Sequence, residues 1–134
     1  MALDAWYKVV TPRKEVREGR SFDPSEFAIA LEQVVAGTAP EDYVKPELFF
    51  SRTCWTRALT EHVGMVLRRL SGQTQNTAPV MTLITQFGGG KTHTLTTLYH
   101  MAKLGPKAKG MAGVRDLWTA AELVETPIAA VGVF

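Results

Sequence analysis

The sequence predicts an α/β fold, a parallel sheet of the P-loop NTPase type preceded by an N-terminal helical region. Three observations predict it. The apolar run PVMTLI at residues 79–84 has the composition of a buried strand. The run TQFGGGKT at residues 85–92 follows it as a glycine-rich loop, and HTLTTLYHMAKLG then has the pattern of a helix. A second apolar run, IAAVGVF at residues 128–134, predicts another strand, and apolar strands separated by helices are typical of parallel sheets.

The first helix is predicted over residues 24–36, after an N-terminal arm at residues 1–20 that is charged and shows no clear period. Asp23 suits the N-cap and Pro24 suits the first helical position. Gly37 supplies the C-terminal stop. The arm itself is expected to be irregular or an extended leading strand.

A longer helix is predicted over residues 53–70, after a loop around Pro40 and a short helical turn that opens at Pro46. Ser71 and Gly72 end it, so residues 21–76 form a helical lead-in. Its predicted buried stripe consists of Trp55, Leu59, Val63, Val66, Leu67 and Leu70.

The C-terminal part, residues 77–134, is predicted to be a partial P-loop nucleotide-binding core, truncated at its second strand. The helix that begins near Lys91 is expected to stop at Gly105-Pro106. A connection rich in Gly, Pro and Lys follows, and VRDLWTAAELV at residues 114–124 predicts a further helix.

The glycine-rich loop has the chemistry of a phosphate site. Gly88, Gly89 and Gly90 allow the backbone N–H groups to turn inward around phosphate oxygens. Lys91 would reach the β- and γ-phosphates, and the Thr92 hydroxyl would coordinate Mg²⁺. The helix dipole favours an anion at the same place. These residues therefore predict ATP and Mg²⁺ as ligands, although Thr85 replaces the first glycine of the usual G-x-x-x-x-G-K-[ST] pattern.

His93 follows Thr92 directly and is predicted to give a supporting contact in the phosphate site. His93 and His100 lie seven residues apart, so they also form a weak candidate pair of metal ligands. Cys54 is interpreted as a small buried residue in preference to a thiol acidified at a helix start.

Basic and aromatic residues outside the loop are interpreted structurally. The arm carries a basic cluster that would contact nucleic acid phosphates, but interspersed glutamates favour a solvated arm. The tryptophans are interpreted as packing residues and not as a platform for bases. The basic cluster consists of Arg13, Lys14, Arg17 and Arg20. The tryptophans are Trp6, Trp55 and Trp118.

Composition leaves the partner class open. The 134 residues include 15 Lys and Arg against 13 Asp and Glu, so a formal charge of +2 does not by itself predict nucleic acid or an anionic membrane as a partner. A single cysteine cannot form an internal disulfide, and no leader or membrane-spanning run is visible. We expect a cytoplasmic protein.

The acidic residue that P-loop hydrolysis requires at a second strand is not evident. After Thr92 the acids are Asp116, Glu122 and Glu125, all within or beside a predicted helix. The chain is therefore expected to be the N-terminal part of a larger ATPase, and by itself it lacks an evident acidic residue of the Walker B type.

Several runs carry a family resemblance: DAWYKVVTPRKEVREGRSFDPSEFAIALEQVV, FFSRT and RLSGQTQNTAPVMTLITQFGGGKTHTL. Together they resemble the N-terminal region of an uncharacterised family of large prokaryotic AAA+-like ATPases, whose members are often found in restriction-like or anti-phage gene clusters beside DNA methyltransferases. The resemblance covers essentially the whole chain. It implies ATP contacts at Gly88, Gly89, Gly90 and Lys91, Mg²⁺ coordination at Thr92, and a chain that continues beyond Phe134.

Three functions follow in order of preference. The first is an ATP-binding Walker A module of a larger AAA+-like ATPase that acts on a macromolecular partner such as DNA in a defence or restriction-like system. The second is a non-catalytic interaction fragment that docks on the remainder of the assembly or on a partner chain. A small-molecule kinase is a third option, for which no lid and no acidic base are evident. Lys91 discriminates between the first two, because only the first requires it.

Overall fold

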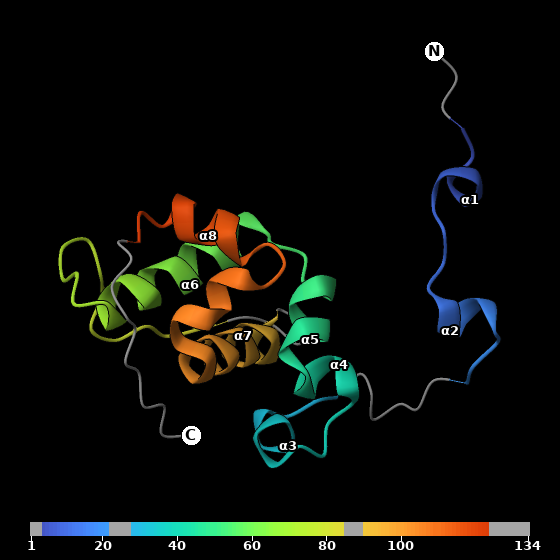
Figure 1. The fold of residues 1–134 in the computed structure, drawn as a ribbon, viewed down its shortest axis with the longest axis horizontal. Coiled ribbons are helices and arrows are strands. Elements are labelled where there is room, and N and C mark those ends of the chain that lie inside the picture. Colours follow the sequence, from blue (N-terminus) through green and yellow to red (C-terminus); the bar gives the residue numbers. More distant parts are fainter. Residues whose placement is uncertain (1–3, 22–27, 85–89, 124–134) are drawn as a thin grey trace.

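The computed structural model describes residues 4–21, 28–84 and 90–123, and within these ranges the chain is helical (Figure 1). Two single turns begin the chain, α1 (Trp6–Val9) and α2 (Lys14–Arg17). The body then comprises α3 (Leu31–Ala36), α4 (Glu41–Val44), α5 (Pro46–Arg52), α6 (Arg57–Leu70), α7 (Lys91–Leu104), the 3₁₀ helix η2 (Gly105–Gly110) and α8 (Val114–Ala120).

The predicted parallel sheet is wrong for the described residues, which contain helices and no strand. Residues 79–84, expected as the strand before the glycine loop, are irregular, and Val80 and Ile84 are 77% and 88% exposed. A lone extended segment cannot satisfy its backbone N–H and C=O groups without a neighbouring strand. The second expected strand, residues 128–134, lies outside the described residues.

The start of α5, the end of α6 and both ends of α7 agree with the sequence expectations. Pro46 opens α5 as expected, and α7 begins at Lys91 and gives way to η2 at Gly105. The helix predicted from residue 53 begins instead at Arg57, because the Thr56 hydroxyl accepts a hydrogen bond from Leu59 N–H at 3.3 Å and caps it there.

Other boundaries differ. The loop expected around Pro40 contains the turn α4, and α8 is shorter than the helix expected over residues 114–124. The helix expected over residues 24–36 is described only from α3 onward, and its predicted cap, Asp23 with Pro24, lies outside the described residues.

A single apolar core joins α5, α6, α7, η2 and α8. α6 and α7 run in the same direction across the body, and α8 packs on α6 and η2 (Figure 1). The stripe predicted for α6 is confirmed at three buried positions, whereas Leu70 is 43% exposed. The core residues of the helices are Phe49, Phe50, Leu59, Val63, Leu67, Met101, Ala108, Val114, Leu117 and Trp118.

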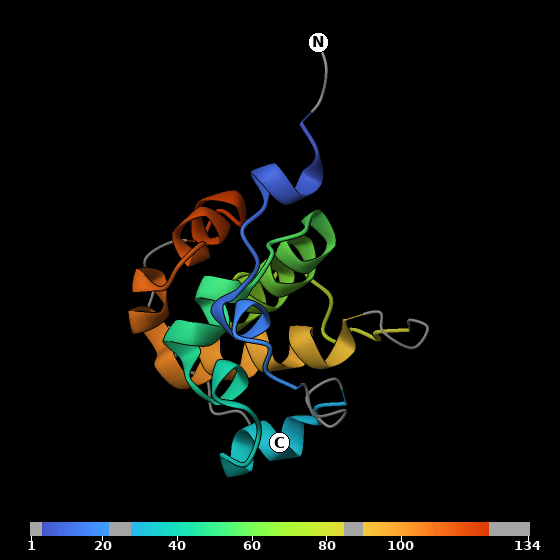
Figure 2. The same ribbon diagram turned by 90° about the vertical axis from the view of Figure 1, so that its right-hand side faces the viewer.

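The N-terminal arm lies beside this body. No residue of α1 or α2 is buried, and α1 projects beyond the body in both views (Figures 1 and 2). Trp6, interpreted from the sequence as a packing residue, is 71% exposed. That interpretation was wrong for Trp6 and right for Trp118, which is 5% exposed.

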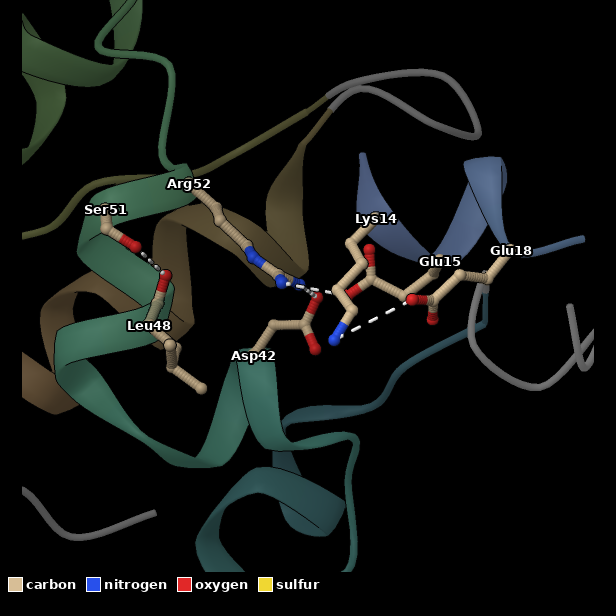
Figure 3. Close-up of polar contacts among 7 residues, drawn as sticks. All are labelled: Lys14, Glu15, Glu18, Asp42, Leu48, Ser51 and Arg52. Atoms are coloured by element: carbon tan, nitrogen blue, oxygen red, sulfur yellow. Dashed lines mark hydrogen bonds and ion pairs between the residues drawn. The ribbon is translucent and has the colours of Figure 1, made fainter. Parts of the chain in front are cut away.

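One ion-pair network ties the arm to the body (Figure 3). Arg52 at the end of α5 pairs with Asp42 of α4, and its Nη2 lies 3.3 Å from Glu15 Oε1 of α2. A hydrogen bond from its own backbone and the nearby Arg52 guanidinium hold the pKa of Glu15 below its ordinary value. The arm is thus held by charge, without apolar burial.

None of the described helices is long and apolar enough to cross a membrane.

Candidate functional site

The start of α7 carries the sequence-predicted phosphate residues that the structure describes. Gly90 is the N-cap, in the left-handed conformation with φ 79°, and Lys91 and Thr92 are the first two helical residues. A side chain at Gly90 would be strained by that φ value. Gly88 and Gly89, together with Thr85, lie outside the described residues.

Within the described residues, neither a side-chain cap nor an acid in the first turn compensates the positive end of α7. α3, α5 and α8 each have an acidic residue in the first turn, and α6 has its Thr56 cap. α7 has no acid in its first turn and no side-chain cap. Among the described α-helices of six residues or more, its start is therefore the one best suited to an external anion, because backbone N–H groups and the helix dipole attract negative charge there.

His93 faces α5. Its ring centroid lies 4.6 Å from that of Phe49, and its Nε2 lies 3.2 Å from Thr53 Oγ1. The Thr53 hydroxyl donates its proton to the Phe49 carbonyl oxygen at 2.8 Å, so His93 Nε2–H is assigned as the donor to Thr53. Burial lowers the pKa of His93, which favours a neutral ring. His93 anchors the start of α7 to α5, and its predicted support of a phosphate stays a prediction.

The buried face of α7 is polar, which the sequence analysis missed. Thr96 and Thr97 are both fully buried, and His100 is 3% exposed. Thr97 Oγ1 donates to the His93 carbonyl oxygen at 2.8 Å, whereas the Thr96 hydroxyl has no hydrogen-bond partner among the described residues. A helix whose interior face contains threonines shows no clear apolar stripe, so periodicity alone could not mark that face as buried.

His100 is a second anchor of the same helix. Its Nε2 lies 2.7 Å from the Tyr43 carbonyl oxygen, which requires the imidazole to donate. Burial lowers the pKa of His100, and the hydrogen bond to Tyr43 opposes that shift. His93 and His100 thus have separate partners on α4 and α5, and no group of metal ligands occurs among residues 4–21, 28–84 and 90–123.

Two further expectations have structural outcomes. Cys54 is exposed in the segment between α5 and α6, so its interpretation as a buried residue was wrong. Asp116 lies in the first turn of α8, where it complements the helix dipole, as its predicted helical position implied.

The P-loop, Walker A and AAA+ ATPase interpretation of the sequence is corrected by the all-helical structure. That interpretation required a strand that leads into the glycine loop, and the described residues before the loop are irregular. The start of α7 keeps the anion-binding chemistry of a helix N-terminus, but the surrounding sheet that defines a P-loop fold is missing from the described part of the chain.

Comparison with known proteins identifies a domain family. The family model described as the DUF499 N-terminal domain matches residues 5–125. Neither the curated proteins nor the solved structures contain a match.

Proposed function

The chain belongs to the DUF499 N-terminal domain family, and we propose from its own residues that the start of α7 binds the phosphates of ATP with Mg²⁺. The observation that carries the proposal is the uncompensated helix start. α7 has neither a side-chain cap nor an acidic residue in its first turn. An anion at this position would complete the end of the helix.

Each residue has a distinct role in this proposal. Gly90 turns the backbone so that the first N–H groups of α7 face the anion. Lys91 adds a positive charge for the terminal phosphates, and the Thr92 hydroxyl is a ligand for Mg²⁺. Gly88 and Gly89 precede them in the chain and extend the phosphate contact.

The anchoring of α7 supports a preorganised site. His93 and His100 fix the helix to α5 and α4, so the first turn cannot swing away from the body without breaking both contacts. Rigid placement of binding groups reduces the entropy lost when a ligand binds. In a longer assembly, the protein would use nucleotide binding to act on a macromolecular partner such as DNA. The sequence resemblance to ATPases of restriction-like gene clusters supports that partner.

Calorimetry of Mg²⁺-ATP with the full 134-residue chain tests the proposal. Lys91→Ala should weaken binding by about tenfold or more, because it removes a charge-assisted contact. Lys103→Ala is the matched control, because it removes the same charge at the opposite end of α7. Equal affinity of the Lys91 and Lys103 variants, with both folded by circular dichroism, would contradict the proposal.

A second candidate is a non-catalytic interaction domain. The observation that favours it is the exposed apolar surface of the arm, where Trp6 is 71%, Tyr7 65% and Val9 66% exposed. Exposed aromatic residues are enriched at protein interfaces. This candidate predicts a folded chain in which Lys91→Ala changes neither nucleotide binding nor association with a partner.

A further inference from the structure

A second polar site lies at the end of the body remote from the start of α7. A pocket of about 620 Å³ is lined by Arg68 of α6, the loop 72–76 and Glu122 after α8. In Figure 1 this loop follows the end of α6 that lies far from α5. The start of α7 is anchored against α5, at the opposite end of the body. The volume falls in the range of small-molecule sites, which is about 300–1,000 Å³.

The guanidinium of Arg68 lines this pocket, and only part of its N–H donors have hydrogen-bond partners among the described residues. Its Nη1 donates to the Ala121 carbonyl oxygen at 3.3 Å, and its Nε is buried with no hydrogen-bond partner in the described part of the chain. Arg52 and Arg57 differ, since each pairs with carboxylates. Within the described ranges Arg68 has no carboxylate partner, so most of its five N–H donors remain available to an oxyanion.

Glu122 occupies a position that normally favours glycine. After α6, Gly72 N–H donates to Arg69 O and Gln73 N–H to Arg68 O, which is the Schellman pattern with the left-handed residue at Gly72.

The same pattern follows α8. Glu122 N–H donates to Thr119 O and Leu123 N–H to Trp118 O, each at 3.1 Å, and Glu122 takes the left-handed position with φ 51°. A glutamate at such a φ value is strained, and glycine would be more stable there. In this conformation Glu122 lines the wall of the pocket.

The backbone strain coincides with the pocket. Asn76 has φ 54°, and Asn76 and Glu122 are the non-glycine residues with positive φ in the described part of the chain. Both line this pocket. Strained residues persist where the surrounding structure fixes them, and they concentrate at ligand sites.

We infer that this pocket binds a small zwitterion of the amino-acid or dipeptide type, whose carboxylate pairs with Arg68 and whose ammonium group pairs with Glu122. The guanidinium fork matches a carboxylate, and the Glu122 charge disfavours a phosphate dianion beside it. Gln73, Gln75 and Asn76 line the same wall with amide groups that donate and accept hydrogen bonds.

The first experiment uses glycylglycine as the probe, with the full chain followed by amide chemical shifts in NMR. We expect a saturable shift at residues 72–76. N-acetylglycine lacks the ammonium group and glycinamide lacks the carboxylate, so each should bind about tenfold more weakly. Absence of a saturable glycylglycine shift, or equal binding of all three probes, would overturn the inference.

Variants identify the residues. Arg68→Met should abolish the glycylglycine shift, whereas Arg57→Met, the same change near the start of α6, should preserve it. Glu122→Gly should raise Tm because it relieves the left-handed strain, yet remove the preference for glycylglycine over N-acetylglycine. A Glu122→Gly chain that keeps the preference, or an Arg68→Met chain that binds like Arg57→Met, would show that the pocket does not recognise a zwitterion through these groups.

Discussion

α6 and α7 are equal in length, at 14 residues each, but they are built differently. α6 has a side-chain cap at Thr56 and buries Leu59, Val63 and Leu67. α7 has no side-chain cap and buries mainly threonines with His100. α6 therefore packs through apolar side chains, whereas α7 buries Met101 together with polar residues and has no side-chain cap. The difference in capping is the one on which the proposed anion site at the start of α7 rests.

Removal of a large apolar side chain from α6 should have the largest effect on stability. Leu67 is 1% exposed, so Leu67→Ala should lower the free energy of unfolding by about 3 kcal/mol through lost burial and a cavity. Urea denaturation followed by circular dichroism measures it. A loss below about 1 kcal/mol would show that α6 is not the packing helix of the pair.

The histidines of α7 should make stability depend on pH. Burial depresses the pKa of His93 and His100 in the folded state below the ordinary value of 6.5, so the unfolded chain binds protons first as the pH falls. Stability should be fully present above about pH 6.5 and decrease as the pH falls toward the folded pKa values, with a slope of at most about 1.4 kcal/mol per pH unit for each histidine.

Denaturant midpoints measured between pH 5 and 8 test this dependence. His100→Gln is the informative variant, because an amide can still donate to the Tyr43 carbonyl oxygen but does not titrate. It should flatten the decrease below about pH 6.5. An unchanged pH profile would assign the dependence to other groups.

Loss of the cap at Thr56 should have a smaller effect. Thr56→Ala leaves the Leu59 N–H without its acceptor and should lower the free energy of unfolding by about 1 kcal/mol. Thr56→Ser retains the hydroxyl and is the control, measured by thermal unfolding. Equal destabilisation by both variants would show that the methyl group of Thr56, and not its cap, supports α6.

Thr96 on α7 should give the smallest change, and of opposite sign. Its hydroxyl is buried without a hydrogen-bond partner, so Thr96→Val should leave stability unchanged or raise it by up to about 1 kcal/mol. The same denaturation assay applies. A clear loss of stability would reveal a polar partner for Thr96 and reduce the contrast with α6.

The sequence predicted the boundaries of the helices better than the contacts between distant elements. α7 begins directly after Gly90 and ends directly before Gly105, because a glycine at each of these positions interrupts the helical backbone. Pro46 predicted the start of α5 for a similar local reason. Such signals act within one turn, so they can be read without knowledge of the fold.

Long-range features were not predictable in the same way. Residues 79–84 have strand composition, but a strand exists only where another strand accepts its hydrogen bonds, and composition does not reveal that partner. For the candidate site, the sequence predicted Gly90, Lys91 and Thr92 at the helix start, and the structure places them there. It did not predict that His93 would turn toward Thr53, because that contact joins residues 40 positions apart.

The tryptophans of this chain differ in solvent exposure, so its intrinsic fluorescence can distinguish the arm from the body. Trp6 on the arm is 71% exposed, whereas Trp118 in the core is 5% exposed. A soluble quencher such as acrylamide will therefore extinguish the emission of Trp6 readily, while Trp118 stays protected until the helices separate. Protection of Trp6 when a candidate partner is added would report engagement of the arm. The protected emission of Trp118, with that of the partly buried Trp55, would report in the same sample that the body is intact.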